Sequence, residues 1–260
     1  DSLSGPPIVW DSVDCISLLF EQAAARSRSL FGKLVTRLEL PRTRRYEADL
    51  VRRFDRVLVT SPKDKAALEA LTERSKPTAS PVQSGITSQE PGDALDHEHA
   101  DRPSSITVLP NGVDLGYFKP GTESREIKTL VLSGKMSYHA NVTAALHLVE
   151  EIMPIVWTRQ PEVRVWIAGK DPTPAVEKLG EDARVTVTGT VPDLRPYLQR
   201  AAVAVVPILY GVGIQNKVLE AMACGTAVVA SPQAVSALQA APGEDLLVGE
   251  HPAGFADAVL

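Results

Sequence analysis

The feature of this chain that most restricts its fold is a regular alternation of short β-rich runs with helix-length segments, which begins at Lys128. The segments between the runs, such as residues 141–158 and 215–223, carry apolar residues at steps of three and four, the period of an amphipathic helix. This alternation predicts a parallel, doubly wound α/β sheet, whose ligands bind at the carboxyl edge of its strands. The runs that we expect to form strands are Thr129–Leu132, Arg164–Ala168, Arg184–Val187, Val203–Val206 and Ala227–Ala230.

The part of the chain before residue 110 is less regular. Its pattern indicates strands at 8–13, 56–60 and 105–109, and helices at 18–54 and 63–74. Three strands are too few for a complete sheet of this kind. We therefore expect the first domain to lack its opening strand and loop, and the second domain to be truncated before its final helix.

The expected domains are a partial first domain at residues 1–118 and a second domain at 119–260, joined through the turn-rich segment 111–122. Residues 75–104 are rich in Pro, Ser, Thr, Gly, Asp and His and predict a mobile surface loop. Asp96–His99 within this loop include residue types that bind metals, but a solvated polar loop is the interpretation that we favour.

Composition excludes several classes of function. A net charge of -5 argues against a nucleic-acid partner, which would require a concentrated basic surface. The longest apolar run, 201–209, is much shorter than the roughly 20 residues that span a bilayer. The two distant cysteines, Cys15 and Cys224, predict buried core thiols in a reducing compartment, so we expect a cytoplasmic protein.

The most informative motif lies between the expected strand at 203–206 and Gly225. A loop with two glycines leads into a helix that Gly225 can end, and the free N–H groups at the start of such a helix favour a phosphate. The candidate residues for binding a nucleotide diphosphate are Gly211, Gly213, Ile214, Gln215, Asn216, Lys217 and Glu220.

The helical period divides this segment into two faces. Asn216 and Glu220 share the face that we expect to line a cleft, while Val218, Leu219 and Met222 lie on the face expected to pack on the sheet. The motif lacks the third glycine of a dinucleotide fingerprint, which disfavours NAD. On this motif alone, an anion site and an ordinary exposed helix with surface charges both remain open.

Two further stretches resemble a known family. The run 108–114, Val-Leu-Pro-Asn-Gly-Val-Asp, and the run 213–231 both resemble the retaining glycosyltransferases of family four. Residues 134–141 and 187–193 further resemble a bacterial branch associated with exopolysaccharide assembly. The resemblance covers most of the chain, more weakly before residue 105. It implies the GT-B architecture, in which two Rossmann-like domains bring donor and acceptor together in the cleft between them.

The resemblance also implies roles for individual residues. The family has two glutamates eight residues apart, of which the second holds the ribose and the first touches the transferred sugar. Glu220 fits the second role, whereas Val212 occupies the first position, so the sugar contact is missing or supplied differently. The family's two basic residues after the first strand of the donor domain would fall near Lys135 and Ala140, and we expect Lys217 to replace the missing one.

Three other polar residues have two open interpretations each. His139, at a strand-to-helix junction beside the expected cleft, is a candidate catalytic residue with Lys135 and Lys217, although a structural role is favoured for it. Asp14, in the run Asp-Ser-Val-Asp that ends a strand, either binds the acceptor or caps a turn, with turn-capping slightly favoured. Glu47 is expected to be a partner in a structural salt bridge.

The resemblance therefore implies sugar transfer, with retention, from a UDP- or GDP-linked donor to a glycan or lipid-linked acceptor, without a separate cofactor. Peripheral association with the inner membrane stays an open alternative for its location. No Asp-x-Asp triplet occurs in the chain, so we assign no metal ligands and expect metal-independent transfer. A nucleotide-sugar 2-epimerase and a non-catalytic nucleotide-binding fragment are the competing interpretations.

Overall fold

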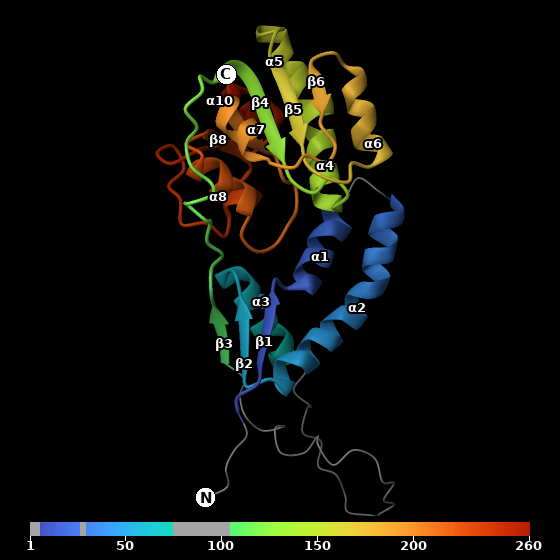
Figure 1. The fold of residues 1–260 in the computed structure, drawn as a ribbon. Helices are drawn as coiled ribbons and strands as arrows, with labels where there is room; N and C mark the ends of the chain where they lie inside the picture. The colour runs from blue at the N-terminus through green and yellow to red at the C-terminus, as the bar shows by residue number, and fades with distance from the viewer. Residues whose placement is uncertain (1–5, 27–29, 75–104) are drawn as a thin grey trace, which may run out of the picture.

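The computed structural model describes residues 6–26, 30–74 and 105–260, and these form two α/β units, the first below the second in Figure 1. The predicted loop at 75–104, and Asp96–His99 within it, lie outside the described residues. Both units contain parallel sheets, which confirms the predicted α/β class.

The first unit has a sheet in the order β1-β2-β3, formed by Val9–Val13, Arg56–Val59 and Ser105–Val108. Its strands lie where the sequence predicts them, because runs of β-branched residues bounded by turns are a local signal. The single helical segment expected at 18–54 is instead two helices. The helices of this unit are α1 (Ile16–Arg26), α2 (Leu30–Arg53) and α3 (Pro62–Arg74).

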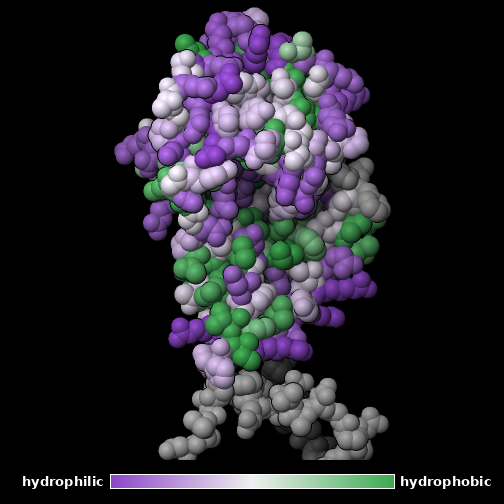
Figure 2. Space-filling view, in the orientation of Figure 1, coloured by the Kyte–Doolittle hydropathy of each residue, from purple (hydrophilic) through white to green (hydrophobic). Residues whose placement is uncertain are grey.

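Only one face of this first sheet is covered in the described part of the chain. Val57, Val59 and Ile106 are buried against α2 and α3; in Figure 1, α3 lies behind the sheet and α2 runs beside it. The opposite side carries exposed apolar residues, and Figure 2 shows apolar side chains gathered over the first unit. The exposed residues at β1 and the start of α1 are Ile8, Val9, Val13 and Ile16.

The second unit has a six-stranded parallel sheet in the order β6-β5-β4-β7-β8-β9. The chain starts in the middle at β4, moves outward through β5 and β6, and returns to the other side of β4 at β7. The carboxyl ends of β4 and β7 therefore form a topological switch point, where ligands bind in open α/β sheets. The strands are β4 (Glu126–Ser133), β5 (Arg164–Ala168), β6 (Val185–Val187), β7 (Ala201–Val206), β8 (Ala227–Ala230) and β9 (Leu247–Val248).

Helices cover both faces of this second sheet, with a separate apolar core on each side. A π-helical turn at Leu148–Ile152 joins α4 to α5, and a 3-10 turn at Lys178–Glu181 follows α6. The helices are α4 (His139–His147), α5 (Met153–Arg159), α6 (Pro174–Glu177), α7 (Arg195–Arg200), α8 (Asn216–Ala223), α9 (Pro232–Val235) and α10 (Pro252–Val259).

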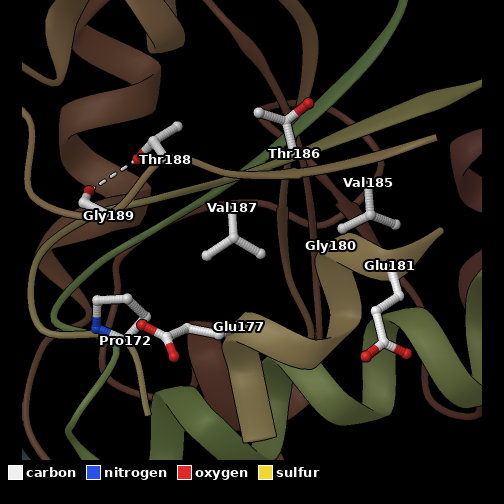
Figure 3. Close-up of a pocket in the computed structure, with 9 residues that line it drawn as sticks. All are labelled: Pro172, Glu177, Gly180, Glu181, Val185, Thr186, Val187, Thr188 and Gly189. Atoms are coloured by element: carbon white, nitrogen blue, oxygen red, sulfur yellow. Dashed lines mark hydrogen bonds between the residues drawn. The ribbon is translucent and has the colours of Figure 1, made fainter. Parts of the chain in front are cut away.

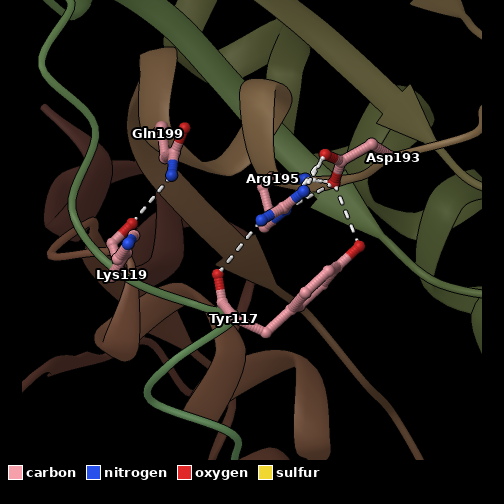
Figure 4. A network of polar contacts seen from close by, with 5 residues as sticks. All are labelled: Tyr117, Lys119, Asp193, Arg195 and Gln199. Atoms are coloured by element: carbon pink, nitrogen blue, oxygen red, sulfur yellow. Dashed lines mark hydrogen bonds and ion pairs between the residues drawn. The ribbon is translucent and has the colours of Figure 1, made fainter.

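The segment between the two sheets is anchored to the second unit, as Figure 4 shows. The guanidinium of Arg195 lies 3.8 Å from the ring centroid of Tyr117 and forms an ion pair of 2.7 Å with Asp193. Gln199 donates a hydrogen bond of 2.8 Å to the carbonyl of Lys119. These contacts fix the direction in which the chain enters the second sheet.

Apolar side chains also join the two units directly. Leu19 and Ala23 of α1 form one buried cluster with Ala140, Tyr210 and Val212 of the second unit. Val212, at the position where the family has its first glutamate, is thus part of the packing between the units. An apolar residue suits this place because a carboxylate there would lose its hydration.

Glu47 has a structural role different from the one expected. Its buried carboxylate accepts the backbone N–H groups of Ile16 and Ser17 at 2.6 and 3.0 Å and so caps the start of α1. It is therefore a helix cap; among the described residues it forms no salt bridge, so that expectation is wrong. The thiol of Cys15 lies beside this cap, and both Cys15 and Cys224 are buried, as predicted.

We expect Glu47→Ala to lower the free energy of unfolding by about 2 kcal/mol, because it removes a cap and leaves buried N–H groups without an acceptor. Urea unfolding followed by circular dichroism measures this change. Glu69→Ala is the matched control, since Glu69 forms an exposed pair with Lys65 and its loss should cost less than about 0.5 kcal/mol. Equal losses for the two variants would contradict the capping role.

Candidate functional site

The candidate site lies at the switch point of the second sheet. Gly134 follows β4, and residues 207–215 follow β7 and lead into α8. Gly225, with a positive φ of 67°, ends this helix and donates its N–H to the carbonyl of Met222. The predicted loop, helix and glycine stop are therefore confirmed.

The start of α8 carries backbone N–H groups without acceptors. Gln215 occupies the cap position, but its side chain does not bond back to the helix. Within the described ranges, the N–H groups of Ile214, Gln215, Asn216 and Lys217 have no hydrogen-bond acceptor. These N–H groups and the positive end of the helix dipole form a site that favours an anion.

Lys217 adds a full positive charge to this site. Its Nζ donates a hydrogen bond of 2.5 Å to Oδ1 of Asn141, whose Nδ2 in turn donates to the carbonyl of Lys135 at 3.0 Å. A Cβ at Gly134 would lie 2.8 Å from Nδ2 of Asn141 and 3.5 Å from Cε of Lys217. Glycine at this turn therefore leaves the space that the lysine occupies.

Burial changes the protonation of two neighbouring groups on α8. It lowers the pKa of Lys217 to about 8, against the opposing effect of the Glu220 carboxylate. Burial also raises the pKa of Glu220, partly offset by the charge of Lys217. A bound diphosphate would stabilise the charged lysine, so anion binding and the protonation of Lys217 are linked.

Asn216 and Glu220 lie on one face of α8, as predicted. Asn216 accepts a hydrogen bond of 3.2 Å from Asn111, which follows β3, so this face meets the cleft between the units. The prediction for the opposite face is only partly right. Val218 is buried in the core, whereas Leu219 lines a cavity in the cleft.

The two glycines of the loop are bonded to the first unit. The N–H of Gly211 donates to Oε1 of Gln22 at 3.0 Å, and that of Gly213 donates to Oδ2 of Asp64 at 3.1 Å. Asp64 is fully buried near the start of α3, and its other oxygen accepts the N–H of Cys15 at 3.0 Å. The first unit therefore fixes the shape of the loop that leads into α8.

His139 is the first residue of α4, next to the cleft. Its Nδ1 lies 3.0 Å from the hydroxyl of Tyr210, and the two rings stack at 5.4 Å. Tyr210 is buried, and its hydroxyl also contacts Thr143 at 3.1 Å. Partial burial lowers the pKa of His139, so the ring is neutral at pH 7 and joins α4 to the loop after β7.

Lys135 and Asp14 lie at the rim of the site. The Lys135 side chain is exposed and has no ion-pair partner in the portion of the chain that the structure describes. Asp14 follows β1, and its Oδ1 accepts a hydrogen bond of 3.2 Å from the hydroxyl of Thr60. Its carboxylate lies against Gly213 of the second unit and caps no turn among the described residues, contrary to the role that we favoured.

Several residues of this site were not singled out from the sequence. Two of them, Gln22 and Asp64, belong to the first unit and bond to the loop after β7. The other two act within the second unit: Asn141 links α4 to α8, and Tyr210 links the loop after β7 to α4. The Ser-Pro-Lys-Asp run at 61–64 has the spacing of a capping box, which marks Asp64 as a helix-start residue. No sequence signal relates it to Gly213.

A cavity of about 550 Å³ lies between the two units, beside the start of α8. Thr60, Lys63 and Asn111 line it from the first unit, and Ile214 and Leu219 line it from the second. A second cavity of about 570 Å³ lies at the β6 edge (Figure 3). Glu177 and Glu181 line this second cavity, and their carboxylates disfavour a diphosphate there.

The family profile of the group 1 glycosyl transferases matches residues 127–260, which is slightly more than half of the chain. The chain belongs to the group 1 glycosyl transferases. The match covers the second unit with its switch point, Lys217 and Glu220. No curated protein sequence matches the chain.

Solved structures of several glycosyltransferases are similar to both units together. Sucrose-phosphate synthase from Thermosynechococcus elongatus has a TM-score of 0.64 at 19% identity, over 96% of this chain and 57% of that one. Anabaena HepE, in complex with UDP and glucose, has a TM-score of 0.63 at 13% identity, over 97% and 61%. The pneumococcal O-GlcNAc transferase GtfA, in complex with UDP and GlcNAc, has a TM-score of 0.57 at 11% identity, over 82% and 39%.

At these identities the likeness concerns the fold. With the family match it confirms the predicted GT-B arrangement of two Rossmann-like domains, and we call the two units domains from here on. This chain spans between 39 and 61% of the lengths of the three structures. Across residues 6–26, 30–74 and 105–260, no helix is long and apolar enough to span a membrane. The same residues contain no cluster of three or more potential metal ligands.

We expect the affinity for UDP to fall by only about twofold between pH 7 and 8 and more steeply as the pH rises further. The reason is that the pKa of free Lys217 is about 8 and a bound diphosphate raises it, so binding at higher pH must take up a proton. Well above pH 8, the affinity should fall by up to about tenfold per pH unit, which is the limit for the uptake of one proton. The phosphate does not contribute, because its second pKa is near 6 and its charge no longer changes in this range.

Isothermal titration calorimetry with UDP at pH 7, 8 and 9 measures this dependence. Lys217→Met is the matched variant, since it keeps the length of the side chain without its charge. The variant should bind UDP more weakly and show a flat profile. Equal profiles for the wild type and the variant would remove Lys217 from the anion site.

Proposed function

We propose that this chain forms the nucleotide-sugar side of a glycosyltransferase of the retaining family-four type. It transfers a hexosyl group from a UDP- or GDP-linked donor to the hydroxyl of a glycan or lipid-linked acceptor. The observation that carries the proposal is the uncapped start of α8 beside Lys217 and Glu220, in a member of the group 1 glycosyl transferases. Anabaena HepE, a structure of similar fold, was solved with UDP and glucose.

The site matches the charge changes of such a transfer. The bond between C1 of the sugar and the diphosphate oxygen breaks, the acceptor oxygen bonds to C1, and the acceptor proton passes to the leaving diphosphate. Negative charge grows on the diphosphate as the first bond breaks. The N–H groups at the start of α8 and the Lys217 ammonium lie where they stabilise that charge. Lys135 adds an exposed positive charge at the rim.

Glu220 is the proposed ribose ligand. It lies one turn beyond the start of α8 on the same face as Asn216, within reach of a nucleoside whose diphosphate sits at the helix start. A carboxylate accepts hydrogen bonds from the two hydroxyl groups of a ribose. The raised pKa of Glu220 reflects a partly buried carboxylate that these hydroxyl groups would stabilise.

For the biological setting, we propose the synthesis of cell-surface or exopolysaccharide chains in the bacterial cytoplasm, with the acceptor presented at the inner membrane. The acidic balance of the chain leaves no role for nucleic acid. The two alternatives make different predictions. A 2-epimerase converts the donor without an acceptor, and a non-catalytic fragment binds UDP or GDP but turns over no nucleotide sugar.

We expect Glu220→Ala to weaken the binding of UDP or GDP by about 1.5–3 kcal/mol, because a charge-assisted hydrogen bond to the ribose is lost. Calorimetry measures the affinity directly. Glu177→Ala is the matched control, since this carboxylate lies at the cavity on the β6 edge and should leave the affinity unchanged. If Glu220→Ala binds nucleotide as tightly as the wild type, the ribose assignment is wrong.

We also expect transfer to persist in excess EDTA, since the helix start and Lys217 already supply positive charge to the diphosphate. The assay follows release of UDP or GDP from the nucleotide sugar in the presence of acceptor. Complete loss of turnover that Mg²⁺ or Mn²⁺ restores would contradict this charge-stabilising role. Lys217→Met should depress turnover more than donor binding, because the charge develops during bond cleavage.

A further inference from the structure

Four consecutive residues of the loop that leads into α8 have no side-chain oxygen or nitrogen to offer a sugar. Residues 211–214 are Gly-Val-Gly-Ile, and the side chain of Val212 is buried against Leu19 and Ala23 of the first domain. A sugar attached to a diphosphate at the start of α8 still carries hydroxyl groups that need hydrogen-bond partners. The hydrogen-bond partners of the sugar must therefore come from residues outside 211–214.

Asp14 of the first domain places a carboxylate against this loop. A Cβ built on Gly213 would lie 1.8 Å from Oδ1 of Asp14, so the carboxylate touches the loop backbone and only glycine fits there. Gly213 also has a positive φ of 63°. Asp14 thus lies beside the residue that directly follows Val212.

The backbone before Asp14 is strained. Val13 has a positive φ of 60°, which is rare for a β-branched residue and costs on the order of 1–3 kcal/mol. It follows an irregularity in the pairing of β1 with β2, between Asp11 and Val13. This turn brings the next residue, Asp14, out of the strand and against Gly213 of the second domain. Such strain persists where the surrounding structure requires one backbone conformation.

Asp14 keeps hydrogen-bonding capacity for a ligand, whereas Asp64 does not. Both oxygens of the fully buried Asp64 already accept hydrogen bonds, Oδ1 from Cys15 and Oδ2 from Ser61 and Gly213. Asp14 has one hydrogen bond, from Thr60 to Oδ1, and its Oδ2 has no partner in the described part of the chain. Burial, and then the charge of Asp64, raise the pKa of Asp14, so hydrogen-bond donors would stabilise its ionised form.

The cavity between the domains reaches the direct neighbours of this carboxylate. Thr60, which binds Asp14, and Ile214, which follows Gly213, both line the cavity of about 550 Å³ between the domains. A carboxylate repels the phosphates of the donor but accepts hydrogen bonds from sugar hydroxyl groups. The negative charge therefore belongs on the sugar side of the loop, and the positive helix start on the diphosphate side.

We propose that Asp14 accepts a hydrogen bond from a hydroxyl group of the transferred sugar and so replaces the contact that Val212 cannot make. The inference rests on the proposed function, since it requires a nucleotide sugar at α8. It assigns the sugar specificity of the donor site in part to the first domain.

The test compares nucleotide with nucleotide sugar, so it needs no acceptor. Calorimetry measures the affinity of the chain for UDP, UDP-glucose, UDP-N-acetylglucosamine, GDP and GDP-mannose. We expect Asp14→Asn and Asp14→Ala to weaken the preferred nucleotide sugar by about ten- to a hundredfold and to leave the parent nucleotide unchanged. Asp11→Asn, an exposed position on the same strand, is the matched control and should change neither.

The outcomes separate this inference from the proposed function. Glu220→Ala should weaken nucleotide and nucleotide sugar alike. If no nucleotide binds the wild type, the donor site itself is wrong and the inference falls with it. If nucleotides bind and Asp14→Ala leaves every nucleotide sugar unaffected, or weakens UDP or GDP equally, the sugar contact is overturned while the donor site stands. Thermal unfolding confirms that the variants are folded.

Discussion

The hydrogen bond from the N–H of Gly213 to the buried carboxylate of Asp64 is the contact on which the geometry of the site depends. It links residues that are 149 positions apart and holds the loop between β7 and α8 against the first domain. Gln22 holds the N–H of Gly211 in the same way. Because both glycines are bonded to the first domain, the N–H groups that stay available to a ligand are those that follow, at the start of α8.

Charge is distributed unevenly around this loop. Lys217 and the helix start lie on the side of β4, where Asn141 holds the lysine in place. Asp14 and Asp64 lie on the side of the first domain. His139 is neutral and adds no charge to either side. A ligand with an anionic end and a hydroxyl-rich end fits this polarity in one orientation, which is the orientation that transfer to an acceptor in the cleft requires.

The sequence predicts those parts of the fold that depend on local signals. The β-branched runs mark β4 to β8, and Gly225 marks the end of α8, because these patterns act within a few residues. The two-residue strand β9 has no such pattern and was not predicted. The division of the segment 18–54 into α1 and α2 was not predicted, because the polar run at 26–29 contains no glycine or proline to mark a helix end.

The residues of the site are also predictable only in part, because sequence patterns report on contacts within a few residues and not on contacts between distant segments. Lys217 and Glu220 follow from the glycine loop and the helical period, within one segment. The roles of Glu47, Asp14 and Asp64 depend on which helix or loop approaches them, and this is decided by tertiary packing. Leu219 faces the cleft and not the sheet because the first domain encloses a cavity beside it.

The central claim is that a nucleotide diphosphate binds at the start of α8. Backbone amide NMR of the isotope-labelled chain during titration with UDP tests it most directly. The account predicts that the largest chemical-shift changes occur at Ile214, Gln215, Asn216 and Lys217, with smaller changes at Gly134 and Asn141. Largest changes at the β6-edge cavity, in residues 185–189, with the amides of α8 unaffected, would contradict it.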